Sequence, residues 1–204
     1  MSIEDRNGYF KYFPFLESER FYLKEVNYSL KDEFIKMMSD DESMKNSGME
    51  ITNVEKQCDM YLKKVKNMYE NKTGIRWSII DKKTEKFLGE IGIYNIDFNS
   101  NNAEIGYSIL KEYWRCGIAS ECILTVEEFF FNNLKMHKII AKIDIKNTPS
   151  VKLIEKLNFY REGVLREHYF NNIEKQYISI AIYSKIINKR QTSNLVCLNL
   201  YYLF

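Results

Sequence analysis

Glycine, proline and long apolar runs are all scarce in this sequence. Its 204 residues include eight glycines and two prolines, and no segment reaches the roughly 18 consecutive apolar residues of a membrane-spanning helix. With 15% aromatic residues, the composition excludes collagen-like, low-complexity and disordered chains. An excess of one charge is also lacking, because 30 basic and 28 acidic residues leave a net charge of +2. Neither a nucleic acid nor a membrane surface is therefore indicated as a partner.

Cysteines in the spacing of a disulfide framework or a metal site are lacking too. Cys58, Cys116, Cys122 and Cys197 form neither a C-x-x-C pair nor a zinc-ligand pattern. The N-terminal residues contain no apolar signal-peptide core. We therefore expect free thiols, a cytoplasmic location and no bound metal.

The hydrophobic periodicity predicts a mixture of strands and helices with no internal repeat. We expect strands over about 20–26, 75–81, 87–96, 103–110, 137–145, 160–170 and 175–186. Helices are expected over about 29–38, 53–69, 120–133 and 149–157. Ser29 and Asn53 are the predicted N-caps of the first two helices, and Pro149 suits the first turn of the last. This order favours an α/β or α+β layered domain, a mixed sheet with helices packed on it.

The two ends of the chain differ from the middle. Residues 1–14 are expected to form a loose arm or a short helix. Residues 189–204 begin with a polar step and end in the apolar run LVCLNLYYLF. This tail could dock on the core, add a strand, or join two copies into a homodimer. The sequence assigns no chemistry to it.

The segment YSILKEYWRCGIASE (residues 107–121) is the most informative for function. A strand ends there, a short loop passes through Gly117, and a helix begins near Ser120. Such a loop directs successive backbone N–H groups and the positive end of the helix dipole at one point, which suits a pyrophosphate. The loop matches neither G-x-G-x-x-G nor G-x-x-x-x-G-K-[ST], which disfavours dinucleotides and nucleoside triphosphates.

Three segments carry a resemblance to a known family: FLGEIGIYNID (87–97), AEIGYSILKEYWRCGIASE (103–121) and KIIAKIDIKNTPSVKLIEKLNFYREGVLRE (138–167). From about Phe15 to Ile187 the chain resembles the GNAT superfamily of N-acetyltransferases, most closely its ribosomal-protein N-terminal acetyltransferase branch. The resemblance implies an N-acetyltransferase domain over 15–188. Its fold would be a mostly antiparallel seven-stranded sheet with about four helices and a splayed central pair of parallel strands.

The resemblance also implies where acetyl-CoA binds. It would lie where the strands at 103–110 and 137–145 splay, without a metal. Backbone groups of Ser108, Ile109 and Leu110 would hold the pantetheine arm and polarise the thioester carbonyl. The family's pyrophosphate loop, [Q/R]-x-x-G-x-[G/A], falls on residues 114–119, with Trp114 departing from the pattern at the first position. The residues implied to line the pyrophosphate are Trp114, Arg115, Cys116, Gly117, Ile118, Ala119 and Ser120.

The reaction implied by the resemblance is direct attack of a neutral amine on the thioester. Many family members donate a proton to the leaving thiolate from a tyrosine, but that position is Ile154 here. The N-x-x-S pattern at Asn147 and Ser150 would serve instead, with Ser150 near the sulfur. Glu104 is the leading candidate for the base.

Two questions stay open at the level of sequence. The first is the base, for which Glu90, Asp144 and Glu167 are alternatives, as is an enzyme with no dedicated base. The second is the acceptor, which could be a protein N-terminus, a polyamine or an aminoglycoside. An acidic cluster at residues 40–42 and Glu50 could attract a cationic acceptor, although such a cluster is more often a solvated loop. A non-catalytic acyl-CoA-binding scaffold and an enzyme for a longer acyl group are the remaining alternatives.

Overall fold

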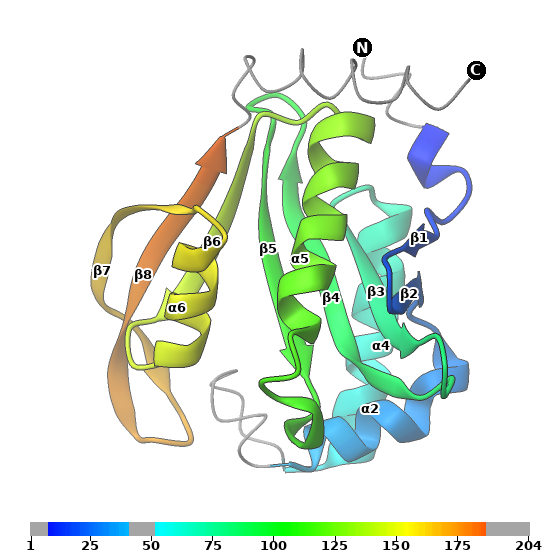
Figure 1. The fold of residues 1–204 in the computed structure, drawn as a ribbon. Coiled ribbons are helices and arrows are strands. Elements are labelled where there is room, and N and C mark those ends of the chain that lie inside the picture. The colour runs from blue at the N-terminus through cyan, green and yellow to red at the C-terminus, as the bar shows by residue number, and fades with distance from the viewer. Residues whose placement is uncertain (1–7, 41–51, 187–204) are drawn as a thin grey trace.

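One eight-stranded sheet runs through the computed structural model, which describes residues 8–40 and 52–186 (Figure 1). The strand order is β1-β2-β3-β4-β5-β6-β8-β7. The strands are β1 (Leu16–Glu17), β2 (Phe21–Glu25), β3 (Gly74–Asp81), β4 (Phe87–Asp97), β5 (Asn102–Ile109), β6 (Lys138–Asp144), β7 (Tyr160–Asn171) and β8 (Gln176–Ile186). The helices are α2 (Lys31–Met38), α4 (Val54–Glu70), α5 (Ile118–Glu128) and α6 (Thr148–Lys156). Short helical turns are Gly8–Phe10, Tyr28–Leu30, Lys111–Tyr113 and the π-helical Phe129–Asn133.

The predicted mixed and mostly antiparallel sheet is confirmed. Every neighbouring pair of strands is antiparallel except β5 and β6, which are parallel. The strand that the sequence did not predict is β1, which adds an eighth strand at the edge through Leu16 and Glu17. Two residues are too few to show the alternation by which a strand is recognised.

Two of the predicted helix starts are confirmed by their hydrogen bonds. The side chain of Asn53 accepts from the Lys56 N–H at the head of α4. Pro149 lies in the first turn of α6, where a missing N–H costs nothing, and Asn147 caps that helix. The sequence predicted the starts of α4 and α6 because each signal lies within four residues of the helix that it starts.

Two other expectations about helices were wrong in detail. Asn27, not Ser29, heads the turn before α2: its side chain accepts from the Ser29 N–H, and α2 then begins at Lys31. The helix expected through residue 133 is α-helical only to Glu128 and continues as a π-helical turn from Phe129. Local propensity does not distinguish these alternatives, since tertiary packing decides them.

The helices form a layer on each side of the sheet (Figure 1). Helices α5 and α6 pack on one face, and their buried residues join the larger hydrophobic core. Helices α2 and α4 cover the other face with a smaller core. On β5, Ile105 and Ile109 face α5 and α6, whereas Glu104 and Ser108 lie on the α4 side, as strand alternation predicts. The two sides are called the α5 face and the α4 face below.

The described part of the N-terminal arm is packed rather than loose. Gly8–Phe10 forms a short 3₁₀ helix, and the rings of Phe10 and Phe13 contact Tyr69. The Trp77 indole N–H donates to the carbonyl oxygen of Pro14 at 2.6 Å. The apolar tail at 189–204 and most of the acidic cluster lie outside the described residues. Within those residues, no helix is long and apolar enough to cross a bilayer.

Candidate active site

The parallel strands β5 and β6 separate soon after they meet. They pair over only four residue pairs, from Asn102 with Lys138 to Ile105 with Ala141. Beyond that point β5 stays paired with β4, and β6 stays paired with β8. An unpaired strand edge therefore opens toward the carboxyl end of β5. This opening is called the β5–β6 gap.

Hydrogen bonds at the end of β5 determine which backbone groups face the gap. Leu110 was expected to bind the pantetheine arm, but its N–H donates to the carbonyl oxygen of Leu88 at 2.9 Å and is not available to a ligand. The Trp114 indole N–H donates to the Ile109 carbonyl oxygen at 2.7 Å. Alternate residues of a strand direct their backbone groups to opposite edges, so Ser108 faces β4, and Tyr107 and Ile109 face the gap. The N–H groups of these last two residues can donate to a ligand lying there.

The loop before α5 gathers backbone N–H groups without acceptors. Arg115 and Gly117 both adopt left-handed conformations, with φ of +63° and +76°, and Gly117 is the N-cap of α5. Among the described residues, the N–H groups of 115–120 have no hydrogen-bond acceptor. Left-handed turns of this kind form a concave anion site, to which the helix dipole adds positive charge. The loop therefore fits a diphosphate.

Arg20, the residue directly before β2, holds this loop in place. Its guanidinium donates to Glu121 at 2.7 Å and to the Cys116 carbonyl oxygen at 3.0 Å, and its backbone N–H donates to Glu121 at 2.8 Å. A Cβ atom added at Gly117 would lie 3.3 Å from the guanidinium. Burial alone would raise the pKa of Glu121, but the hydrogen bonds from Arg20 and Ser18 outweigh it, and the pKa is lowered.

The first turn of α6 brings Asn147 and Ser150 to the α5 face. The Asn147 side chain accepts from the Ser150 N–H at 3.2 Å, so one of its functions is to cap the helix. Ser150 is half-buried and lies beside the Tyr107 hydroxyl of β5. Ile154 is fully buried in the core, so no polar group reaches the gap from that position.

A family model described as an acetyltransferase (GNAT) domain matches residues 20–160, more than half of the chain. The chain belongs to the GNAT acetyltransferase family. An uncharacterized N-acetyltransferase of Bacillus subtilis, YoaA, is 33% identical over 160 residues, which is 78% of this chain and 90% of that protein. Members of this family named N-acetyltransferases are thus similar to this chain along most of its length.

Solved structures share the GNAT fold. RimJ of Mycobacterium smegmatis in complex with CoA-disulfide has a TM-score of 0.76 and 16% identity, covering 85% of this chain and 87% of that one. The spermidine N-acetyltransferase of Vibrio cholerae in complex with CoA and spermine has a TM-score of 0.71 and 19% identity, covering 81% and 95%. At these identities the likeness concerns the fold alone.

Two carboxylates of this GNAT domain lie on the α4 face, and both are paired. Glu104 accepts from Lys142 of β6 at 2.8 Å and from the Asn95 side chain at 3.0 Å. This ion pair bridges the two strands just where the gap opens. Glu104 is thus placed at the gap, although it is not a free carboxylate.

Glu90 is the more deeply buried of the two carboxylates. It accepts from the Tyr61 hydroxyl of α4 and from Arg76 at 3.0 Å. Burial and the neighbouring Glu90 carboxylate raise the pKa of Tyr61 well above its ordinary value, so the phenol stays protonated and donates. The Arg76 guanidinium also lies over the ring of Tyr94, 5.3 Å from its centroid. These contacts describe a satisfied polar cluster rather than an open base.

The two other carboxylates considered as bases lie elsewhere. Asp144 ends β6 and accepts from the Lys146 N–H at 2.9 Å, as a turn residue. Glu167 lies within β7 and not at the start of the last hairpin, which begins at Tyr160. Its side chain is exposed, and its backbone N–H donates to Ser179. Among the described residues, neither side chain forms a hydrogen bond or ion pair with β5.

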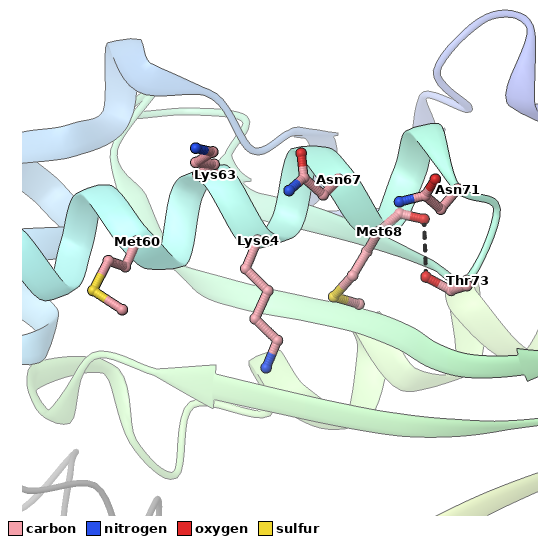
Figure 2. Close-up of a pocket in the computed structure, with 7 residues that line it drawn as sticks. All are labelled: Met60, Lys63, Lys64, Asn67, Met68, Asn71 and Thr73. Carbon is pink, nitrogen blue, oxygen red and sulfur yellow. Dashed lines mark hydrogen bonds between the residues drawn. The ribbon is translucent and has the colours of Figure 1, made fainter.

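A surface pocket of about 460 Å³ lies along α4 (Figure 2). Its lining residues are Met60, Lys63, Lys64, Asn67, Met68, Asn71 and Thr73. In Figure 2, Lys64 and Met68 extend from the helix toward the strands. Met68 lies against Gly74, which pairs with Tyr94, and the Tyr94 ring lies over Gly106 of β5. The pocket therefore adjoins the α4 face near β5, and it contains two lysines and no carboxylate.

Several residues at the site were missed by sequence reasoning. Arg20 contacts Cys116 in the loop before α5 from 96 positions away in the chain, and Tyr61 contacts Glu90 from 29 positions away. Tyr107 was given no function. The sequence contains no local signal that Arg20 lies beside the expected anion-binding loop, because only the fold brings the two segments together.

Proposed function

We propose that the protein transfers the acetyl group of acetyl-CoA to a primary amine by direct attack in a ternary complex. One observation carries this proposal: a row of backbone N–H groups without acceptors at the head of α5, beside parallel strands that separate. An anion site at one end of an open strand edge matches a ligand with a diphosphate and an extended arm. The CoA complexes of similarly folded proteins support the same assignment.

The chain's own groups are suited to the acyl donor in this proposal. The N–H groups of residues 115–120 would hold the diphosphate, and Arg20 adds charge beside them. The arm would lie in the β5–β6 gap, with the thioester carbonyl accepting from a backbone N–H of β5. Such a donor stabilises the oxyanion that forms when the amine attacks.

The two faces of the sheet separate the amine from the leaving group. Glu104 lies on the α4 face, so the amine would approach from that side and release its proton toward Glu104 through water. Ser150 lies on the α5 face, so the thiolate would depart toward it. In this arrangement the group that receives the amine's proton and the group beside the departing sulfur lie on different sides of the gap, so each can be positioned independently.

Charge on the α4 face favours a peptide N-terminus over a polyamine as acceptor. A polyamine would be recognised by several unpaired carboxylates, but Glu90 and Glu104 are already paired with Arg76 and Lys142. The adjoining pocket contributes lysines. We therefore place the acceptor in the class of peptide N-termini, which agrees with the named ribosomal-protein acetyltransferases among proteins of the same fold.

The test begins with calorimetric titration of acetyl-CoA into the native chain and into Gly117→Trp. A bulky side chain at Gly117 would block the diphosphate, so we expect micromolar binding that the substitution abolishes. The control is Gly163→Trp, because an added Cβ at Gly163 meets nothing within 4 Å. A folded native chain that does not bind acetyl-CoA would contradict the proposal.

The acceptor is then tested by release of free thiol. Peptides beginning with Ala or Ser, and spermidine, would be compared at equal concentration with the native chain. We expect turnover with a peptide. Turnover with spermidine alone would overturn the acceptor class but not the acetyl transfer.

The cytoplasm is the proposed location of this activity. Cys58, Cys116 and Cys122 are all free thiols in the described residues, as in proteins of reducing compartments. Within the same residues, no group of histidine, cysteine and carboxylate side chains could hold a metal ion.

A further inference from the structure

The Tyr107 hydroxyl is buried without a hydrogen-bond partner. Among the described residues, its oxygen is one of two buried side-chain polar atoms that lack one. A buried phenol normally finds a partner, because leaving it unpaired costs on the order of 1–3 kcal/mol. An exception of this kind in a folded protein suggests a partner that arrives with a ligand.

Tyr107 stands at the β5–β6 gap. It lies two residues beyond Ile105, the last residue of β5 that pairs with β6. Its ring packs on the α5 face against the main core, and its hydroxyl lies beside Ser150 at the start of α6. With a strand rise of about 3.3 Å per residue, Tyr107 lies about 7 Å closer than Ile109 to the point where β5 and β6 separate. It is therefore further than Ile109 from the diphosphate site.

Burial keeps this phenol protonated. Burial raises the pKa of Tyr107 above its ordinary value, and the Ser150 hydroxyl lowers it in part. At neutral pH the group is therefore a protonated phenol with a proton to donate. Ile154, where many relatives have their tyrosine, is buried and apolar, so this position contributes no donor.

We propose that Tyr107, whose hydroxyl lies beside Ser150, donates the proton to the departing CoA thiolate. This inference rests on the proposed acetyl transfer and adds the acid that the reaction needs. In that step the C–N bond forms and the C–S bond breaks, and the sulfur takes the bonding electron pair and the phenol's proton. The phenolate then regains, by way of water, the proton that the amine released toward Glu104, so that one proton passes in total from nitrogen to sulfur.

The variants that test this are Tyr107→Phe and a matched control, Tyr183→Phe. Tyr183 is also a buried tyrosine that contacts α6 from the sheet, through a hydrogen bond of 2.9 Å to Glu155. With the peptide that turns over best, we expect Tyr107→Phe to lower kcat about a hundredfold and to change KM for acetyl-CoA less than about threefold. Tyr183→Phe should keep the native kcat.

A second readout needs no turnover. The ultraviolet absorbance of the thiolate reports the pKa of CoA's thiol when the product is bound. A phenol that donates to the sulfur stabilises the thiolate, so the pKa of the bound thiol should rise by about one unit in Tyr107→Phe and stay unchanged in Tyr183→Phe. Equal thiol pKa values and equal kcat in the native chain and Tyr107→Phe would overturn the inference.

The outcomes separate this inference from the proposed function. If the native chain binds CoA but acetylates no peptide or amine, the acetyl transfer fails and the inference fails with it. If it acetylates a peptide and Tyr107→Phe does so equally well, only the inference fails. If Tyr107→Phe does not fold, the native protein alone decides. Without a donor near the sulfur, desolvation would raise the pKa of the thiol of bound CoA above that of free CoA. A raised thiol pKa in the native complex would therefore overturn the inference.

Discussion

Arg20 shows how one side chain can organise a ligand site from far along the chain. It joins residues 96 and 101 positions later, the Cys116 carbonyl and the Glu121 carboxylate. The loop that it contacts contains Arg115 and Gly117 in left-handed conformations, which most residues adopt only at a cost. We infer that the Arg20 contacts help to offset this cost and keep the N–H groups of the loop directed at one point.

The Glu121→Gln variant tests this contribution. The pKa of Glu121 is lowered in the folded protein, so its stabilisation is present above the ordinary value of 4.5 and is lost as the pH falls through the folded value. We expect Glu121→Gln to lower the free energy of unfolding by on the order of 1 kcal/mol at pH 7, because the pair is partly exposed. The difference from the native chain should vanish in strong acid, as measured by urea unfolding.

Glu112→Gln provides the control for that measurement. Glu112 forms an ion pair with Lys36 at 3.0 Å, but both side chains are about half exposed. Such a pair contributes little, so the variant should unfold like the native chain at every pH. An equal loss in both variants would show that the contact with Arg20 has no special importance.

Helix α6 depends on Asn147 at its first turn. The side chain of Asn147 accepts from the Ser150 N–H, which is otherwise without a partner in the helix. Asn147→Ala should lower the free energy of unfolding by about 1 kcal/mol, whereas Asn147→Asp, which also caps well, should unfold like the native chain. If Asn147→Asp retains stability but loses activity, the amide has a separate function at the thioester. Thermal unfolding and thiol release together distinguish these cases.

Helix α5 is tied to β8 by a buried ion pair. Lys185 donates to Glu127 at 2.7 Å, while the other Glu127 oxygen has no partner among the described residues. Burial raises the pKa of Glu127, and Lys185 only partly opposes this. The carboxylate therefore depends on the lysine to stay ionised at neutral pH.

Lys185→Met should consequently lower the free energy of unfolding at pH 7 by about 3–5 kcal/mol, since it leaves a buried charge unpaired. The loss should shrink as the pH falls, because a protonated Glu127 needs no cation. The double variant Glu127→Met with Lys185→Met should recover most of the stability, because apolar side chains can replace a buried pair. A pH-independent loss, or no recovery, would contradict this account.

The sequence predicted those elements whose signals are local. Asn53 and Pro149 marked helix starts correctly, and the strand expected over 103–110 is β5. What it did not predict depends on residues far apart in the chain. The contacts of Arg20 with the α5 loop, and of Lys142 with Glu104, follow from strand order, which no local pattern encodes.

At the scale of the molecule, the sheet consists of two parts joined by the short pairing of β5 with β6. One part is β1 to β5, and the other is β6, β8 and β7. A ligand in the β5–β6 gap would contact both parts and so stabilise their association. The native state should therefore gain more rigidity at this junction than elsewhere.

Acetyl-CoA at a hundred times its dissociation constant should raise the free energy of unfolding by about 2.7 kcal/mol. For a domain of this size that corresponds to a rise in Tm of roughly 5 to 11 °C. Amides that exchange by local opening should slow in β5 beyond Ile105 and in the first turn of α5, whereas local opening elsewhere in the sheet should not change. Unchanged local opening in β5 would place the ligand elsewhere.

The position of β8 in the sheet has a consequence for synthesis of the chain. Among the described residues it is the last strand in sequence, yet it lies between β6 and β7 and pairs with both. Strand β7 therefore has no neighbour in the sheet until residues 176–186 have been made. A premature stop codon before Gln176 would remove the strand that holds β7 in place, and the nascent polypeptide would leave the ribosome with an unprotected edge on β6. Such fragments should be captured by chaperones or degraded, and only translation through β8 should give a soluble product.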